Sequence, residues 1–213
     1  MNVLPGPLLA VAVLFFVFPP LKEIDALKEI SYAIPCFMVV FCAFIMGMAP
    51  SSSCAVSMEG KKMWILKTSP IETKKILFVK AYIYVLLCFP AVIISPIYGL
   101  IDLHFTILDA IFVFLSNFML VSVFATISLW INTIRYKLNW NNASEAVKSS
   151  SSVLFAMLID FVLQILLVVP AIIFYILQID ARIIIIVVSI IEFVFCNWLL
   201  FTHGVRKFEK IVV

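Results

Sequence analysis

The chain has 213 residues, of which 65% are hydrophobic and only 13% are charged, and its mean hydropathy is +1.21. A water-soluble domain of this size needs a largely polar exterior, so the composition excludes a soluble globular protein and indicates an integral membrane protein. The net charge of +3 is small, so the position of the charges matters more than their sum. The five cysteines show no C-x-x-C pair and no Cys/His metal spacing, and we interpret them as small apolar side chains.

Six apolar stretches can each form a membrane-spanning helix, which needs about 20 predominantly apolar residues. These runs lack the alternation of a barrel strand, and backbone groups in lipid must be bonded internally, so helices are expected. We therefore predict an all-α integral membrane protein with a single domain over residues 1–213. The expected spans are 4–21, 31–49, 76–100, 105–131, 153–178 and 183–203.

The basic residues predict the orientation. Twelve of the fifteen Lys and Arg residues fall in segments 50–80, 132–150 and 204–213, and the other three fall in the loops that alternate with them. Because positively charged loops stay in the cytoplasm, these three segments are expected there. With an even number of spans, both termini are then cytoplasmic.

The loop between the second and third spans is the most unusual stretch of the chain. Residues 57–80 contain six lysines and Trp64. Glu59 to Lys67 is predicted to form a short amphipathic helix, with Met63, Trp64 and Leu66 on its apolar side. Two interpretations remain open: an interfacial helix that rests on anionic lipid, or a docking element for a cytoplasmic partner with Trp64 as its anchor.

The sequence Ser69-Pro70-Ile71-Glu72 is typical of a helix start. Ser69 suits the N-cap, Pro70 suits the first helical position, and Glu72 can complete a capping box. The third helix is therefore expected to begin here. Three lysines follow on its first turns, where their stems can extend toward lipid phosphates: Lys74, Lys75 and Lys80.

The stretch SMEGKKMWILK at residues 57–67, followed by Ser69-Pro70, resembles a segment of ABC-2-type exporter permeases, roughly S-R-E-G-K-x-x-W-x-L-K-x-x-P. Met58 stands where that family usually has arginine, so a contact of that arginine is not carried over. The resemblance implies that this segment couples the permease to a separate ATPase subunit. The residues expected to do so are Ser57, Glu59, Gly60, Lys61, Lys62, Trp64, Lys67 and Pro70.

A second stretch, LNWNNASEAVK at residues 138–148, resembles the W-x-x-E-x-x-x-V-K loop of the same permeases. The matching residues are Trp140, Glu145 and Lys148, although Glu145 stands later than the pattern has it. Both stretches are predicted to lie on the same membrane face, in the family's order.

The resemblance implies a six-helix permease of the bacterial cytoplasmic membrane, similar to the C-terminal half of longer members, that pairs with a second copy or a homologous half. A separate cytoplasmic ATPase would bind ATP and Mg²⁺ and dock on a short coupling helix after the second span. The sequence contains no G-x-x-x-x-G-K-[ST] loop, so ATP hydrolysis is expected on that partner. The basic loops follow the membrane charge rule and do not indicate nucleic-acid binding.

A few polar residues interrupt the predicted spans. Asp160 and Gln164 lie one turn apart on the fifth span, and Glu192 is near the middle of the sixth. An ionised carboxylate at mid-membrane costs at least about 2.5–3.5 kcal/mol, so these groups should face the bundle, pair or be protonated. For the two carboxylates, two interpretations remain equally open. One is functional, as part of a substrate path or a proton-sensitive gate; the other is structural, as partners in an interhelical hydrogen bond. For Gln164 we favour a structural role.

Asp109 is expected near the outer end of the fourth span, where water can reach it.

Two other function classes remain open. One is an intramembrane enzyme that uses Asp160 and Glu192, although no nucleophile or metal motif such as H-E-x-x-H accompanies them. The other is a non-transporting anchor or immunity-type protein. For an exporter, the short outer loops and the few polar residues in the spans favour an amphipathic or apolar cargo.

Overall fold

A computed structural model of the chain describes residues 8–12, 14–16, 33–48, 51–140, 151–177 and 179–211. Over these ranges the chain is helical and contains no strand, and five helical segments are long and apolar enough to cross a membrane. The all-α class is therefore confirmed for this part of the chain, and the five segments fit a membrane helical bundle. The first expected span, 4–21, lies largely outside the described residues.

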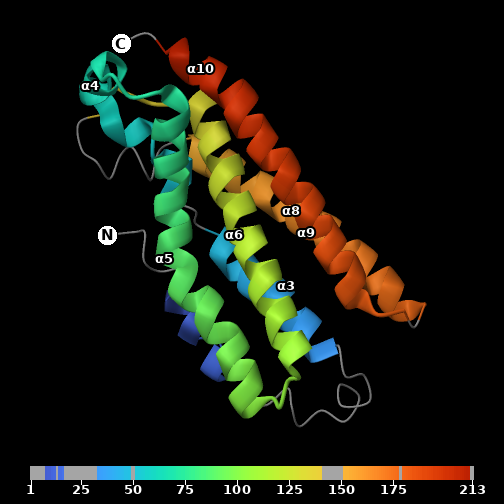
Figure 1. Cartoon of the computed structure of the whole chain (residues 1–213). Helices are drawn as coiled ribbons and strands as arrows, with labels where there is room; N and C mark the ends of the chain where they lie inside the picture. Colours follow the sequence, from blue (N-terminus) through green and yellow to red (C-terminus); the bar gives the residue numbers. More distant parts are fainter. Residues whose placement is uncertain are drawn as a thin grey trace.

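The other five expected spans each correspond to a long helix that begins and ends within about one turn of the predicted bounds. They are α3 (Ala33–Gly47), α5 (Thr73–Asp102), α6 (Ile107–Ile134), α8 (Ser151–Ile176) and α9 (Ala181–Leu199). A π-helical turn, η3 (Leu200–Gly204), and the short helix α10 (Val205–Glu209) continue α9 without a break (Figure 1).

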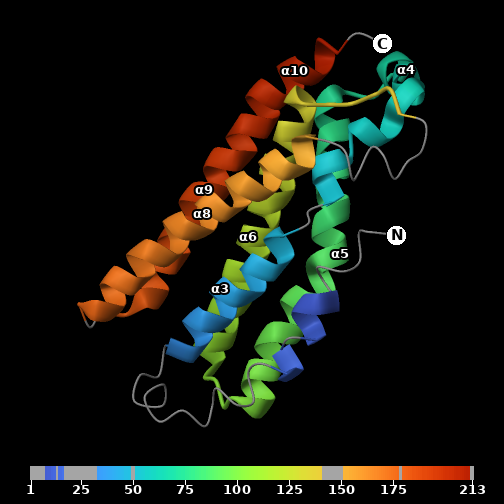
Figure 2. The ribbon, with the colours of Figure 1, turned by 180° about the vertical axis from the view of Figure 1, so that it is seen from behind.

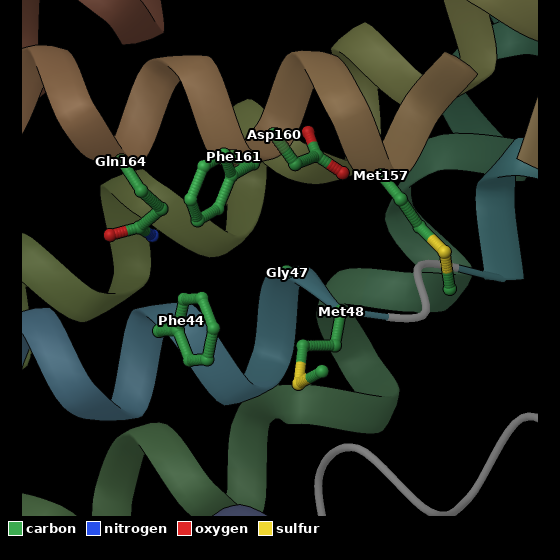
Figure 3. A pocket seen from close by; sticks show the side chains of 7 residues that line it. All are labelled: Phe44, Gly47, Met48, Met157, Asp160, Phe161 and Gln164. Carbon is green, nitrogen blue, oxygen red and sulfur yellow. The ribbon is translucent and has the colours of Figure 1, made fainter. Parts of the chain in front are cut away.

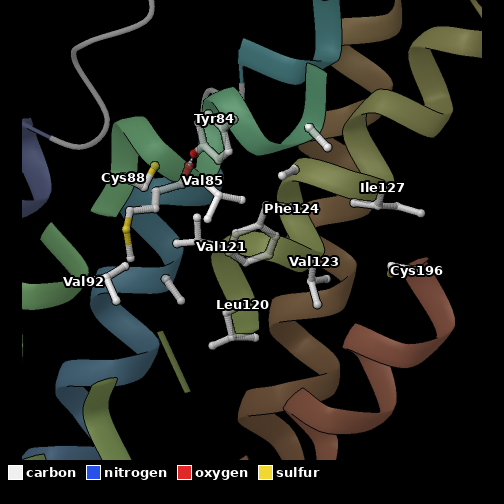
Figure 4. Close-up of a cluster of buried hydrophobic side chains, with 14 of the residues drawn as sticks. Tyr84, Val85, Cys88, Val92, Leu120, Val121, Val123, Phe124, Ile127 and Cys196 are labelled. Carbon is white, nitrogen blue, oxygen red and sulfur yellow. Dashed lines mark hydrogen bonds between the residues drawn. The ribbon is translucent and has the colours of Figure 1, made fainter. Parts of the chain in front are cut away.

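Helix α6 lies at the centre of the bundle. It contacts α3, α5, α8 and α9, and Figures 1 and 2 show it between these helices from both sides. All side chains from Leu120 to Leu129 are buried. Figure 4 shows Val121 and Phe124 of this row in one cluster with Tyr84 and Val85 of α5.

The outer helices bury only one side. α8 and α9 expose large apolar side chains along their length, including Leu158, Phe161 and Ile191. A continuous surface of this kind is unfavourable in water but is the normal exterior of a helix in lipid, where backbone bonds are satisfied within the helix. The distribution of apolar residues therefore agrees with a membrane protein.

The membrane-spanning segment that begins with α3 extends beyond this helix, over Ala33–Thr68. The 15 residues of α3 by themselves extend about 22 Å, against a hydrocarbon thickness of about 30 Å. The buried Tyr84 hydroxyl donates to the carbonyl of Met46 near its C-terminal end, which satisfies one of the carbonyls that a helix end leaves free. The chain continues in 3-10 turns, η1 (Ser51–Cys54) and η2 (Ser57–Lys62), and then in α4 (Met63–Thr68).

The expected start of the third span at Ser69 is wrong. Ser69 instead ends α4 in an extended conformation, with ψ 140°, as expected for the residue before a proline. α5 begins at Thr73, and Glu72 is its N-cap without a side-chain capping bond. The Glu72 carboxylate instead forms an exposed ion pair with Lys75, with 3.5 Å between Oε2 and Nζ.

The described parts of the three basic segments lie at one end of the bundle, which we call the basic end. It comprises residues 51–80, 132–140 and 204–211, and Figure 1 shows α4 and α10 at this end. The loops 103–106 and 179–180 lie at the other end of α5, α6, α8 and α9.

At that other end a buried acid joins two helices. Asp109 forms a capping box with Thr106 at the start of α6, and its Oδ1 also accepts from Nη1 of Arg182 on α9. The expectation that water reaches Asp109 is therefore wrong, because its partners surround it. Arg182 also pairs with Asp180, and this hydrogen bond lowers the pKa of the Asp180 carboxyl.

Candidate functional site

Ser57 is the centre of a buried hydrogen-bond network at the basic end. The N–H groups of Val56 and Ser57 donate to Oδ1 of Asn132, at 2.7 and 3.1 Å. In return, Nδ2 of Asn132 donates to Oγ of Ser57 at 2.9 Å. The Ser57 Oγ also accepts from the N–H of Lys137 at 3.0 Å. One side chain of α6 thus fixes the chain just before α4.

The same amide also reaches α8. Nδ2 of Asn132 donates to Oγ of Ser152 at 2.9 Å, and the Ser152 hydroxyl donates to the carbonyl of Ser53 at 2.8 Å. Asn132 and Ser152 are both fully buried. The segment between α3 and α5 is therefore bonded to α6 and α8 where these two helices reach the basic end. A buried network whose hydrogen bonds are satisfied fixes the segment in one conformation.

The two stretches that resemble ABC-2 permeases are in contact. Nε1 of Trp140 donates to the carbonyl of Ser57 at 2.8 Å. The Trp140 ring also covers Gly60, whose φ of +51° lies in the left-handed region that favours glycine. Glu145 and Lys148, the other residues of the second stretch, lie outside the described residues.

Glu59 binds α5. Its Oε1 accepts from Nζ of Lys80, and the same ammonium donates to the carbonyl of Ala55 at 3.0 Å. The Lys80 side chain is only 13% exposed. The expectation that Lys80 extends toward lipid phosphates is therefore wrong, because a carboxylate and a carbonyl within the protein bind its charge.

The expected amphipathic helix is shorter than predicted and presents a different face. Gly60 interrupts it, so that only Met63–Thr68 is α-helical. Met63 is fully buried and Leu66 is half-buried, whereas Trp64 is 56% exposed. The aromatic ring at the centre of the motif is thus available to a partner or to lipid.

The lysines around Trp64 differ in their surroundings. Lys61 and Lys62 are exposed, as is Pro70 at the end of the motif. Nζ of Lys67 donates to the carbonyls of Glu209, at 3.2 Å, and Ile211. Because cations interact favourably with the free carbonyls at a helix C-terminus, Lys67 joins α4 to the end of α10.

The polar residues of α8 line a pocket between α3 and α8. Its volume is about 200 Å³, and Figure 3 shows the side chains of both helices that border it. Asp160 is 2% exposed and accepts from Oγ of Ser128 at 3.2 Å. The lining residues are Phe44, Gly47, Met48, Met157, Asp160, Phe161 and Gln164.

The pocket leaves polar atoms without partners. Within the described part of the chain, Oδ1 of Asp160 and both amide atoms of Gln164 have no hydrogen bond. From the sequence we favour a structural role for Gln164, through an interhelical hydrogen bond. Among these residues, however, its amide has no hydrogen-bond partner. Its amide faces the pocket beside Phe161 instead (Figure 3).

Glu192 lies apart from this pocket. It is buried on α9, and both of its carboxylate oxygens lack a hydrogen-bond partner among the described residues. Glu192 and Asp160 lie on two helices, α9 and α8, that pack against each other, although only Asp160 borders the pocket.

Asn132, Ser152 and Lys80 were not predicted as site residues. An asparagine in the last turns of a predominantly apolar helix is a recognisable signal, because an amide in lipid requires a partner. The local sequence does not identify that partner, since Asn132 and Ser57 are 75 residues apart in the chain.

Comparison with known proteins yields no relative: no family model, no curated protein and no solved structure matches the chain.

Proposed function

We propose that this chain is the membrane-spanning permease subunit of an ABC-type exporter. In this proposal residues 4–21 supply a sixth span, both termini are cytoplasmic, and the basic end faces the cytosol. A separate ATPase docks on residues 57–70, and the chain pairs with a second copy or a homologous half to form the translocation path.

One observation carries this proposal. Trp64 projects from the basic end, while the segment that bears it is bonded to three helices of the bundle: to α6 through Asn132, to α8 through Ser152, and to α5 through Glu59. An exposed anchor on a rigidly attached segment is what a coupling element requires, because force applied at the surface must reach the spans. The resemblance of residues 57–70 to the coupling segment of ABC-2 permeases supports the same role.

The charge at the basic end supports the orientation. Lys61, Lys62, Lys74 and Lys75 are all exposed there. Such a surface also fits anionic lipid, so an experiment must separate docking from lipid binding. Measurements in an uncharged detergent do so, because no anionic lipid surface is then present.

The proposal is tested by purifying the tagged chain from its native host in such a detergent and measuring vanadate-sensitive ATP hydrolysis in the eluate. Trp64→Ala should lower this activity by about thirtyfold, since loss of an aromatic anchor typically costs about 2 kcal/mol of binding free energy. Trp198→Ala is the matched control, because Trp198 is 53% exposed but lies on α9, distant in sequence from the docking segment. The control should retain the activity of the unmodified chain.

Absence of ATP hydrolysis from every preparation, or equal activity in the two tryptophan variants, would contradict the proposal. A non-transporting anchor would keep the ATPase but tolerate polar substitutions in the spans without loss of export. An intramembrane enzyme would show turnover without any ATPase and would lose it on Asp160→Asn.

A further inference from the structure

The pocket between α3 and α8 combines an apolar rim with buried polar atoms that have no partner among the residues that the structure describes. Asp160 and Gln164 are 2% and 6% exposed. A buried carboxylate oxygen and a buried amide without hydrogen bonds are unfavourable in an apolar environment, and natural proteins rarely leave them so. Two of these atoms, Oδ1 of Asp160 and Oε1 of Gln164, are acceptors, and their presence in the wall of one pocket indicates a ligand that donates hydrogen bonds.

The position of the pocket indicates where a ligand would enter. Asp160 is nine residues into α8, about 13 Å from the helix start, and therefore lies at the depth of the hydrocarbon. Phe44, Met48 and Phe161 line the pocket and are also exposed on the outer surface of the bundle. The opening thus faces the lipid side, and an apolar chain can extend out of it.

We propose that this pocket binds the protonated amino group of a single-chain amphipathic amine. The Asp160 carboxylate accepts a charge-assisted hydrogen bond from the ammonium, and the Gln164 carbonyl accepts a second one. The rings of Phe44 and Phe161 at the pocket wall suit a cation and the carbon atoms next to it. The apolar tail extends between α3 and α8 into the lipid.

Size and charge favour such an amine over a phospholipid. A cavity of about 150 Å³ holds one benzene molecule, so a volume near 200 Å³ accommodates an ammonium group and several carbons. None of the lining residues in the described part of the chain is basic, so the phosphate of an ethanolamine lipid would lie beside the Asp160 carboxylate without a counter-charge from them. An amine without a phosphate avoids this repulsion.

This binding needs no ATPase, so it can hold or fail independently of the proposed export function. If the chain is an exporter, the site identifies a lipophilic amine as its class of cargo or inhibitor.

The experiment uses the full chain in phosphatidylcholine nanodiscs and a dodecylamine that carries a diazirine near its amino group. Photolysis followed by peptide mass spectrometry should place the label on α3 and α8 around Phe44, Met157 and Phe161. Unlabelled dodecylamine should compete, and dodecanol, which has the same chain but no charge, should not. Equal competition by the alcohol, or label spread evenly over all lipid-facing helices, would overturn the proposal.

Variants test the role of the carboxylate. Asp160→Asn preserves the shape of the side chain but removes its charge, and should raise the Kd of the amine by about tenfold or more. Glu192→Gln is the matched control, because it removes another buried carboxylate that does not line the pocket, and it should leave the Kd unchanged. Equal affinity in the two variants would overturn the proposal.

Two further arms keep the test decisive. If Asp160→Asn does not give a monodisperse protein, Met157→Trp decides instead: it fills the opening without removing a buried charge, and should block labelling. Undiminished labelling of this variant contradicts the proposal. If phosphatidylethanolamine in the nanodisc abolishes labelling, the resident ligand is a phospholipid headgroup and the assignment to a single-chain amine is wrong.

Discussion

The ring of Trp140 occupies the space that a side chain at residue 60 would need: a Cβ on Gly60 would lie 2.9 Å from Cε2 of the indole. The left-handed backbone of Gly60 and the hydrogen bond from the indole to Ser57 belong to the same contact. Two stretches of sequence that are about 80 residues apart therefore form one structural unit at the basic end.

Gly60→Ala is expected to destabilise this unit. A non-glycine residue in the left-handed region costs about 1–3 kcal/mol, and the added methyl also collides with the indole. The melting temperature of the purified protein in detergent should fall. In the double variant with Trp140→Ala the collision is absent, so the two losses should be less than additive. Strict additivity would show that the ring and the glycine are not in contact.

Asn132→Leu should destabilise the protein by about 2 kcal/mol or more, because it leaves the buried N–H groups of Val56 and Ser57 without an acceptor. Asn139→Leu is the matched control, since Asn139 is exposed near the same end. Chemical or thermal unfolding of both variants provides the measurement. Similar stabilities in the two would rule out the proposed importance of the network.

Lys80→Met removes the ammonium that both Glu59 and the Ala55 carbonyl bind. Its loss should cost about 1–3 kcal/mol, because the carboxylate of Glu59 then remains partly buried without a cation. Lys75→Met serves as the control: this lysine is on the same helix, and its side chain is 70% exposed. Exposed ion pairs contribute about 0–1 kcal/mol, so the control should unfold almost like the unmodified chain. A comparable loss in both variants would argue against the buried pair.

Acidification should weaken the opposite end of the bundle through Asp180. The hydrogen bond from Arg182 lowers the pKa of Asp180 below its ordinary value of 3.8. The pair therefore contributes stability above that ordinary value, and the contribution is lost as the pH falls through the lower, folded-state pKa. The difference in melting temperature between the unmodified chain and Asp180→Asn should shrink as the pH is lowered below 4. A difference that is constant with pH would show that the ion pair contributes no linked stability.

The sequence alone was sufficient to predict the helical class and the position of five long helices. Whether a stretch is apolar enough to span a membrane depends only on neighbouring residues, so helices such as α6 and α8 could be located without knowledge of their contacts. Local signals were less reliable at helix ends. Ser69 and Glu72 have the chemistry of a helix start, yet Ser69 instead ends α4 and α5 begins at Thr73 with Glu72 as its N-cap.

Only the tertiary structure decided what the polar residues do. Lys80 and Trp64 both had a plausible place at the membrane surface, but folding buries the lysine against Glu59 and leaves the tryptophan exposed. Asn132 acquires its role from Ser57, and Asp160 acquires its pocket from α3. Hydropathy is a property of a single segment, whereas a hydrogen-bond partner or a pocket wall comes from a distant segment, and only the packing of the helices brings the two together.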